Sequence, residues 1–457
     1  IWLFDLSLGN LKMNEGGLGA PERHKIPWRE SDYYNPDRLD QEMRRVFDIC
    51  HGCRRCFNLC DSFPRLFDLI DDSETGELDS VNSNDFKSVV DACTLCDMCF
   101  MVKCPYVPPH EFDLDFPHLM LRYRAVQLKE GKSSTMRRQI TETDRNGKLG
   151  CSASKLANWA SSTTNSITRP LMQGVMGIDK NAALPKFNNK LLSKRTVPIS
   201  INTDAPAYGR KAIIYSTCTS EYNKAELGLA SAEVLAKNGV ETHFVYPGCC
   251  GMPQLEHGDI KRVAENAKKI AAEMVGWIEK GYDVVSLVAS CSLMLKFEWP
   301  LIEPDDENIK KLSSATFDVS EYLIDIAAKE GIAPGLKPVD GGITIHIACH
   351  ARAQNMGRKG ADMLNLIPNT QVDVIERCSG HGGSWGIMKD NFETALKVGK
   401  PVARESAKKA SRYVVSECLL AQDHILQGVE QINSKKFTKG PEQVKHPIEL
   451  MAISYRE

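Results

Sequence analysis

The sequence predicts an α+β protein of several domains, in which a helical, cysteine-rich unit precedes a duplicated α/β unit. Three observations predict this fold class. The chain has 457 residues and 16 cysteines, and eight of these cysteines fall between Cys50 and Cys104. Apolar residues at helical spacing lead into those eight cysteines. From about residue 211 onwards, short apolar strands alternate with amphipathic helices, and this order occurs twice.

The composition argues against some classes of partner. The formal net charge is −2 at pH 7, so the chain has no basic excess to meet the phosphates of a nucleic acid. No apolar run approaches the roughly 18 to 20 residues that span a bilayer, which predicts no transmembrane segment and leaves peripheral membrane contact open. Because the chain begins with Ile1 rather than methionine, a removed N-terminal segment also stays open.

We expect six segments along the chain. They are an N-terminal arm (1–34), a helical cysteine-rich domain (35–125), a connector (126–205), a first α/β repeat (206–335), a second α/β repeat (336–435) and a C-terminal tail (436–457). The arm is expected to need a partner surface to order it. The first part of the connector is polar and loop-like, and Trp159 further along is expected to serve packing.

The first eight cysteines form two runs with a spacing typical of iron–sulfur ligands. CHGCRRCFNLC supplies Cys50, Cys53, Cys56 and Cys60, and CTLCDMCFMVKCP supplies Cys93, Cys96, Cys99 and Cys104. In two-cluster ferredoxins, the fourth cysteine of each run binds the other run's cluster. We therefore expect one [4Fe-4S] cluster on Cys50, Cys53, Cys56 and Cys104, and a second on Cys93, Cys96, Cys99 and Cys60. A pair of zinc sites is the alternative, but zinc favours separated Cys-x-x-Cys pairs over triplets.

Helices rather than strands are expected to deliver these cysteines. NPDRLDQEMRRVFDIC places apolar residues at helical spacing, namely Leu39, Met43, Val46, Phe47 and Ile49. NDFKSVVDAC repeats the pattern, with Asn84 as the expected N-cap. This arrangement resembles the α-helical ferredoxin module of succinate dehydrogenase iron–sulfur subunits and of heterodisulfide reductase. The predicted fold is thus an α-helical two-cluster ferredoxin followed by the duplicated α/β unit.

Charged residues beside the two sets of cysteines suggest a difference in redox potential. Arg54, Arg55 and Lys103 adjoin the first set, whereas Asp61, Asp91 and Asp97 adjoin the second. A cation favours the more negative, reduced state of a cluster, and an anion disfavours it. Our hypothesis is that the cluster at Cys50 has the higher potential and receives electrons from the cluster at Cys93. The alternative is that these side chains point to water and are screened.

The α/β part repeats one pattern of strands, helices and cysteines. In the first half, strands lead to Cys218, to the pair Cys249 and Cys250, and to Cys291. In the second half, strands lead to Cys349, to Cys378 with Ser379, and to Cys418. Corresponding positions are offset by about 130 residues, which indicates an internal duplication. Cys151 fits neither half and is interpreted as an ordinary thiol.

Alternating strands and helices predict a parallel sheet that is covered on both faces. Ligands of such sheets collect outside the carboxyl ends of the strands, and the cysteines of both halves lie at that edge. In the stretch CCGMPQLEHGD, Gly251 allows the tight turn that brings two adjacent thiolates close to a bulky cofactor. Thiolates from several strands are therefore expected to converge on one centre.

The CCG turn and its repeat resemble the duplicated cysteine-rich domain of the heterodisulfide reductase B-type family. With the ferredoxin-like block in front, residues 35 to 430 resemble the iron–sulfur oxidoreductases that include the C subunit of anaerobic glycerol-3-phosphate dehydrogenase. Further matches are CHARAQNMG in the second repeat and GIDKNAALPKFNN in the connector. The resemblance implies a motif of one cysteine, then Cys-Cys-Gly, then Cys-x-x-Cys, which can hold an unusual iron–sulfur cluster for thiol or disulfide chemistry.

The chain departs from that motif at three positions. Met294 and Ala421 replace the last cysteine of the two Cys-x-x-Cys pairs, and Ser379 replaces a cysteine of the second CCG. The first half keeps Cys218, Cys249, Cys250 and Cys291, which suffice for a third iron–sulfur cluster, with a redox disulfide plus spare thiols as the alternative. The second half keeps Cys349, Cys378 and Cys418, and His381 or His350 would complete a zinc or iron–sulfur centre there. For His350, a hydrogen bond to the cofactor is the alternative.

These features predict a subunit that relays single electrons through two [4Fe-4S] clusters to a cysteine-bound centre in the CCG domain. A flavoprotein is the expected partner, because flavins convert electron pairs into single electrons. The acceptor would be a quinone, a thiol or a protein, and the expected location is the cytoplasm or the inner face of the membrane. A catalytic thiol/disulfide reductase of the heterodisulfide type is one alternative, although the lost cysteines argue against paired clusters. A redox sensor or scaffold with structural metals is the other.

Overall fold

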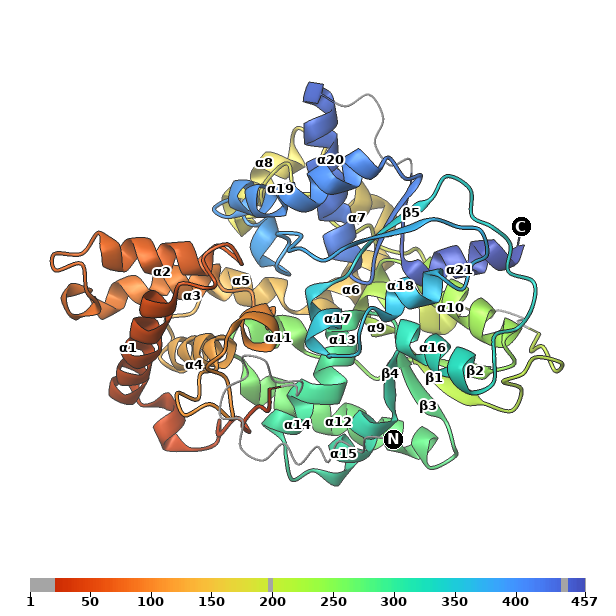
Figure 1. The fold of residues 1–457 in the computed structure, drawn as a ribbon, viewed down its shortest axis with the longest axis horizontal. Helices are drawn as coiled ribbons and strands as arrows, with labels where there is room; N and C mark the ends of the chain where they lie inside the picture. Colours follow the sequence, from red (N-terminus) through yellow and green to blue (C-terminus); the bar gives the residue numbers. More distant parts are fainter. Residues whose placement is uncertain (1–20, 196–199, 437–442, 457) are drawn as a thin grey trace, which may run out of the picture.

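The computed structural model describes residues 21–195, 200–436 and 443–456 of the chain. It consists of a helical cysteine-rich unit, at the left of Figure 1, and a larger body that holds two parallel β-sheets. The body combines helices and sheets as predicted, and each of its two sheets has four strands.

Four α-helices build the helical unit. They are α1 (Pro36–Cys53), α2 (Ser62–Asp71), α3 (Phe86–Ala92) and α4 (Phe116–Lys129), with the short turns η1 (Ser31–Tyr34), η2 (Leu78–Ser80), η3 (Ser83–Asp85) and η4 (Cys99–Lys103). As predicted, α1 buries Leu39, Met43, Val46 and Phe47. The predicted N-cap at Asn84 is wrong. Asn82 instead accepts a hydrogen bond from the Asn84 N–H and begins the turn η3 ahead of α3.

The first repeat contains a sheet of order β2-β1-β3-β4. Its strands are β1 (Lys211–Tyr215), β2 (Glu241–Val245), β3 (Asp283–Ser286) and β4 (Thr316–Asp318). Its helices are α9 (Thr217–Tyr222), α10 (Ala225–Lys237), α11 (Met252–Glu256), α12 (Ile260–Ile278), α13 (Ala289–Leu293), η6 (Met294–Glu298), α14 (Trp299–Ile302), α15 (Glu307–Ala315) and α16 (Val319–Lys329). All strand pairs are parallel, because every connection returns through helices.

The second repeat has the equivalent strand order, β6-β5-β7-β8. Its strands are β5 (Ile343–His346), β6 (Val372–Ile375), β7 (Tyr413–Ser416) and β8 (Gln443–Lys445). Its helices are α17 (Cys349–Ala353), α18 (Lys359–Leu364), η7 (Trp385–Ile387), α19 (Phe392–Lys409), α20 (Leu419–Lys436) and α21 (Pro447–Arg456). The matching strand orders of the two sheets support the internal duplication that the sequence predicted. The sequence pattern missed β4 and β8, and the range expected to be a tail contains β8 and α21.

The two repeats exchange their last helices. The last helix of the first repeat, α16, packs against α18 of the second, and α21 of the second packs against α10 of the first. Figure 1 shows α21 beside α10 at the right of the molecule. Leu450 and Met451 of α21 are fully buried, and the Tyr455 hydroxyl donates to the carbonyl oxygen of Ala333 at 3.0 Å. Neither repeat therefore completes its core without the other.

The described part of the N-terminal arm packs on the molecule's own surface. Ile26 N–H donates to the carbonyl oxygen of Leu301 at 2.9 Å, and Trp28 Nε1 donates to that of Ile302 at 3.0 Å. Residues 21–30 therefore find, within this chain, the ordering surface that was expected from a partner. The first 20 residues lie outside the described residues.

The first part of the connector is helical where its polar composition predicted a loop, and it forms α5 (Thr135–Ile140) and α6 (Thr143–Ser152). The part that follows forms α7 (Ser154–Ser161), α8 (Thr168–Met176) and the turn η5 (Leu192–Lys194). Tertiary contacts override composition here, because Gly147 and Gly150 of α6 lie so close to Tyr222 and Phe187 that an added Cβ would meet those rings at 2.3 and 2.4 Å.

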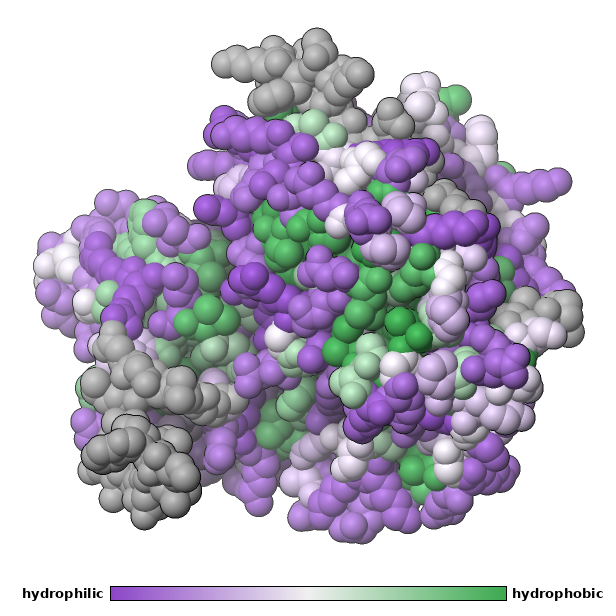
Figure 2. Space-filling view, turned by 45° about the vertical axis from the view of Figure 1, so that its right-hand side comes forward, coloured by the Kyte–Doolittle hydropathy of each residue, from purple (hydrophilic) through white to green (hydrophobic). Residues whose placement is uncertain are grey.

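An exposed apolar surface covers α6 to α8. Its large side chains are Leu149, Leu156, Trp159, Ile167, Leu171 and Val175, each more than half exposed. Trp159, expected to serve packing, is 56% exposed. On the face drawn in Figure 2, by contrast, hydrophilic residues predominate and hydrophobic residues gather toward the centre. Within the described ranges, no helix has the length and apolar character that crossing a bilayer requires.

Candidate iron–sulfur site

All 16 cysteines are free thiols, and the eight of the helical unit gather into two groups. Burial raises the pKa of Cys50, and the charges of Cys104, Cys56 and Cys53 raise it further. Burial likewise raises the pKa of Cys60, with further contributions from Cys96 and Cys93. The pKa of Cys99 rises through burial and through Cys96 and Cys93, with Cys56 and Cys60 contributing less.

The cysteines that shift one another's pKa values in this way form two groups. In each group, the fourth cysteine of one run lies with the first three cysteines of the other run. The first group is Cys50, Cys53, Cys56 and Cys104, and the second is Cys60, Cys93, Cys96 and Cys99. Groups of four such thiols suit [4Fe-4S] clusters, because a cluster replaces the proton of each thiol with an iron and neutralises the buried charge.

The loop that carries Cys93, Cys96 and Cys99 is held from several sides. Leu95 and Asp97 in this loop both adopt positive φ, at 47° and 63°. The guanidinium of Arg23 pairs with the Asp97 carboxylate at 2.7 Å, and Arg124 donates to the carbonyl oxygen of Cys93. Such contacts offset the cost of a left-handed backbone at residues other than glycine.

Ion pairs reduce part of the charge difference expected between the two groups. Asp97 is paired with Arg23, Asp91 with Lys87, and Asp61 with Arg65. Arg54 in turn pairs with Asp71. Arg55 and Lys103, the other two cations named above, still act to lower the pKa of Cys56 in the first group, and Asp97 acts to raise the pKa of Cys93 and Cys96 in the second. The order of the two potentials therefore stays a prediction.

The four thiols of the first repeat converge just beyond the carboxyl ends of its strands. Cys218 lies in α9 after β1, Cys249 and Cys250 follow β2, and Cys291 lies in α13 after β3. The sulfur atoms of Cys249 and Cys218 are 3.9 Å apart, and those of Cys250 and Cys291 are 3.2 Å apart. Gly251 makes the turn with φ of 88°. The two adjacent thiols therefore point to different partners rather than forming a strained ring.

Among the four thiols of the first repeat, the surroundings favour the ionised form of Cys249. Hydrogen bonds from the thiols of Cys218 and Cys250 lower the pKa of Cys249. The same hydrogen bonding, together with burial, raises the pKa of Cys218 and of Cys250. An iron–sulfur cluster that binds all four sulfurs would remove this competition, which is the chemical reason the set fits such a cluster.

Asp144 of the connector also belongs to the site, although no motif in the sequence points to it. Its Oδ2 accepts from the Cys249 N–H at 3.2 Å, and its Oδ1 accepts from the hydroxyl of Tyr222 at 3.2 Å. Tyr246 donates to the same oxygen. The carboxylate thus anchors the Cys-Cys-Gly turn to α6. Asp144 lies in a polar stretch without periodicity, so only the fold reveals this role.

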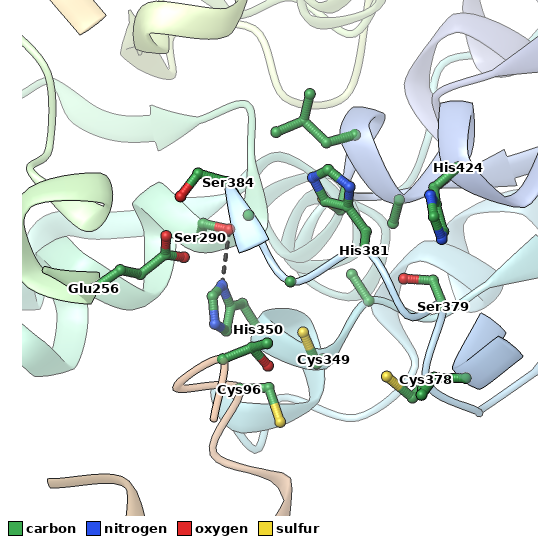
Figure 3. A pocket seen from close by; sticks show the side chains of 18 of the residues that line it. Cys96, Glu256, Ser290, Cys349, His350, Cys378, Ser379, His381, Ser384 and His424 are labelled. Atoms are coloured by element: carbon green, nitrogen blue, oxygen red, sulfur yellow. Dashed lines mark hydrogen bonds between the residues drawn. The ribbon is translucent and has the colours of Figure 1, made fainter. Parts of the chain in front are cut away.

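The three thiols of the second repeat lie beside the helical unit. Burial raises the pKa of Cys349, with Cys96, Cys378 and Cys418 as further causes. The pKa of Cys96 in turn is raised to about 12 by burial and by Cys378. Figure 3 shows Cys96, Cys349 and Cys378 together at the foot of the cavity. The second group of the helical unit is therefore the direct neighbour of the second repeat's centre.

His381 lies apart from the three thiols with which the sequence grouped it. Its ring packs against that of His424, with centroids 5.9 Å apart, and Figure 3 shows both rings on the far side of the loop from Cys349. Burial, together with His424, lowers the pKa of His381 to about 3. Among the residues that the structure describes, none gives its Nε2 a hydrogen bond. Across the ranges the structure describes, no three side chains of Cys, His, Asp or Glu converge tightly enough to hold a single ion.

A cavity of about 1060 Å³ joins these sites. Cys60 and Cys96 of the helical unit line it, as do all the thiols of both repeats named above and His381. Glu256 also lines it, and burial raises the pKa of this carboxyl to about 7 although Arg124 opposes the rise. The cavity therefore offers one shared space in contact with three sets of thiols and with groups that can exchange protons.

Comparison with known proteins identifies the two halves of the body. Residues 212–296 and 343–420 each match the cysteine-rich domain called CCG. The chain is 25% identical over 287 residues to the C subunit of the anaerobic glycerol-3-phosphate dehydrogenase of Escherichia coli, and the match covers 61% of this chain and 69% of the relative.

Two further relatives carry different names. The B subunit of the fumarate reductase (CoM/CoB) of Methanothermobacter marburgensis is 27% identical over 256 residues, covering 54% of this chain and 47% of that protein. The lactate utilization protein A of Macrococcus caseolyticus is 28% identical over 185 residues, covering 39% of this chain and 73% of the relative.

Proposed function

We propose that this chain, which carries two copies of the CCG cysteine-rich domain and is homologous to oxidoreductase subunits, relays single electrons between iron–sulfur centres. The observation that carries the proposal is the neighbourhood of Cys96, Cys349 and Cys378, which brings the helical unit's thiols to the second repeat. Electrons hop between centres that lie close together, so this contact defines a route into the CCG domains.

The helical unit is proposed to be an α-helical ferredoxin with two [4Fe-4S] clusters. One cluster would be held by Cys50, Cys53, Cys56 and Cys104, and the other by Cys60, Cys93, Cys96 and Cys99. Cys218, Cys249, Cys250 and Cys291 would hold a third cluster. Cys349, Cys378 and Cys418 would hold an iron–sulfur centre with one ligand from outside this set. When bound, such clusters accept and release one electron at a time.

A flavoprotein is proposed as the electron donor or acceptor in the same complex. The relatives are named as subunits of a glycerol-3-phosphate dehydrogenase and a fumarate reductase, and two-electron substrates need a flavin to split electron pairs. The exposed apolar surface of α6 to α8 supports a contact with another protein or with a membrane surface, because contiguous exposed apolar patches mark such sites. The final acceptor would be a quinone, thiol or protein, at the cytoplasmic face of the membrane or in the cytoplasm.

The proposal is tested by anaerobic purification, with iron, acid-labile sulfide and zinc analysis and EPR. We expect about eight iron atoms per chain from the two ferredoxin-type clusters and about four more from the first repeat, all reducible. Replacing Cys96 by serine should remove one cluster signal and leave that of the Cys50 group. Colourless protein without labile sulfide, or zinc as its only metal, would refute the relay.

A catalytic role is the second candidate, and the cavity favours it. A cavity of about 1060 Å³ in contact with the exposed thiol Cys378 would admit a small thiol or disulfide substrate. This role predicts thiol- or disulfide-dependent turnover by the isolated, cluster-loaded chain. An electron relay without a substrate site predicts that turnover requires the partner protein.

A further inference from the structure

His350 links residues next to three different cysteines, in three different parts of the fold. It directly follows Cys349 of the second repeat and is 8% exposed. Its Nδ1 lies 2.8 Å from the hydroxyl of Ser290, the residue before Cys291 in the first repeat. Its Nε2 lies 3.2 Å from the carbonyl oxygen of Leu95, the residue before Cys96 in the helical unit. Figure 3 shows the ring between Ser290 and Cys96.

The partners of the ring determine its tautomer. The Leu95 carbonyl oxygen can only accept, so Nε2 carries the proton and donates it. Nδ1 then accepts from the Ser290 hydroxyl. Both nitrogens are therefore engaged, and neither has a lone pair left for a metal. The suggestion that His350 completes the ligand set of the second repeat is thus not supported by its contacts.

Further contacts hold the ring in this place. The Gln354 side chain donates to the carbonyl oxygens of Ala289 and His350, at 3.2 and 3.1 Å, and so ties α17 to α13. On the other side, Leu95 has φ of 47°, a backbone conformation that needs external support in a residue with a side chain. The bond from His350 is such a support, because it fixes the carbonyl of that residue.

We propose that His350 is a positioning residue that holds the loops of Cys96, Cys291 and Cys349 in a constant arrangement, and thereby sets the electron transfer from the helical unit into both repeats. The geometric half of this inference is independent of any cofactor. The half that concerns electron transfer rests on the proposed function. Two readouts therefore separate the failure of one from the failure of the other.

The experiment compares variants of the full chain, purified anaerobically with its native metals. His350→Ala removes both hydrogen bonds, whereas His350→Gln keeps a donor that can reach Leu95. His346 supplies a matched control, because it is also buried and also bonds a serine hydroxyl and a backbone carbonyl, Ser416 at 3.0 Å and Arg377 at 2.9 Å. Both partners of His346 lie in its own repeat.

The first readout is hydrogen–deuterium exchange of peptides that cover residues 93–99. We expect about tenfold faster exchange in His350→Ala, partial recovery in His350→Gln, and no change in His346→Gln. If His350→Ala does not fold, Ser290→Ala removes only one of the bonds and should give a smaller increase. Unchanged exchange in the variant that folds, or an equal increase in the His346 variant, would overturn the positioning role.

The second readout is the magnetic interaction between reduced centres in the EPR spectrum. A looser Cys96 loop should weaken the splitting or broadening between the helical unit's cluster and its neighbour in His350→Ala, but not in His346→Gln. Faster exchange with an unaltered spectrum would support the geometric half and refute the electron-transfer half. Absence of any cluster signal in the parent protein would refute the proposed function and leave the exchange result valid.

Discussion

Asp144 illustrates how a single side chain outside every motif can belong to a site. Its carboxylate accepts hydrogen bonds from the Cys249 backbone and from the hydroxyls of Tyr222 and Tyr246. Three donors from the first repeat thus converge on one helix of the connector. The residue matters because of where α6 packs, not because of its neighbours in the sequence.

Replacing Asp144 by asparagine tests this anchor. The amide keeps the size of the side chain but presents N–H groups toward at least one of the three donors. We expect the free energy of unfolding to fall by about 1–3 kcal/mol, measured by denaturant titration under anaerobic conditions. The exposed Asp390, changed in the same way, should alter it by less than about 0.5 kcal/mol. Equal effects in the two variants would contradict the anchoring role.

Glu256 gives a prediction for pH. Burial raises the pKa of this carboxyl from 4.5 to about 7. Between these values the folded protein holds a proton that the unfolded chain has lost, so the free energy of unfolding falls as pH rises through this window. The loss amounts to up to about 3 kcal/mol for a shift of this size.

Glu256→Gln should remove this part of the pH dependence. Because glutamine is neutral at every pH, the variant is expected to lose less stability than the parent between pH 5 and pH 8. Denaturant titrations at several pH values measure the two slopes. Parallel slopes for parent and variant would show that Glu256 is already ionised in the folded protein at low pH.

At the scale of elements, the last helix of each repeat completes the core of the other. α21 packs on α10, and α16 packs on α18, so the two CCG domains form one interlocked body. Residue patterns predicted the strands and helices next to the cysteines, because those follow periods of two or 3.6 residues. The range that contains α21 was expected to be a C-terminal tail, and nothing in its residue pattern says which repeat the helix covers.

Leu450 tests the exchange of helices. It is fully buried in α21, so Leu450→Ala should lower the free energy of unfolding by about 2–5 kcal/mol through lost burial and the remaining cavity. Leu149 on α6 is 64% exposed and provides the matched control, for which less than about 0.5 kcal/mol is expected. Hydrogen exchange should also rise in α10 of the first repeat. Exchange confined to the second repeat would contradict the interlocked arrangement.

At the scale of the molecule, Arg23 joins the helical unit to the first repeat. Its guanidinium pairs with Asp97 at 2.7 Å and Asp115 at 2.8 Å in the helical unit, and with Glu298 at 3.2 Å in the first repeat. The side chain is 11% exposed. The N-terminal arm is therefore part of the contact that keeps the helical unit beside the CCG domains.

Removing Arg23 should be costly. Arg23→Ala removes the cation that pairs with Asp97 and leaves His118 as the cationic partner of Asp115 and Glu298, and we expect a loss of about 3–5 kcal/mol in the free energy of unfolding. Lys87→Ala, which breaks the exposed pair with Asp91, should cost no more than about 1 kcal/mol. Limited proteolysis would check whether the helical unit separates first. Equal losses in both variants would show that the Arg23 cluster is solvated and contributes little.

The amino-acid sequence alone predicted the two runs of cysteines, the helices and strands that carry most of the thiols, and the duplication of the body. These features are local, or repeat at a constant offset, so a pattern along the chain reveals them. Folding in three dimensions was needed to show that Asp144 reaches Cys249, that His381 faces His424, and that His350 joins three cysteine loops. It was also needed to show that acidic residues beside the cysteines are paired with Arg23, Lys87 and Arg65. Most of these contacts join residues far apart in the chain, and the remainder depend on side-chain conformation, which no spacing rule specifies.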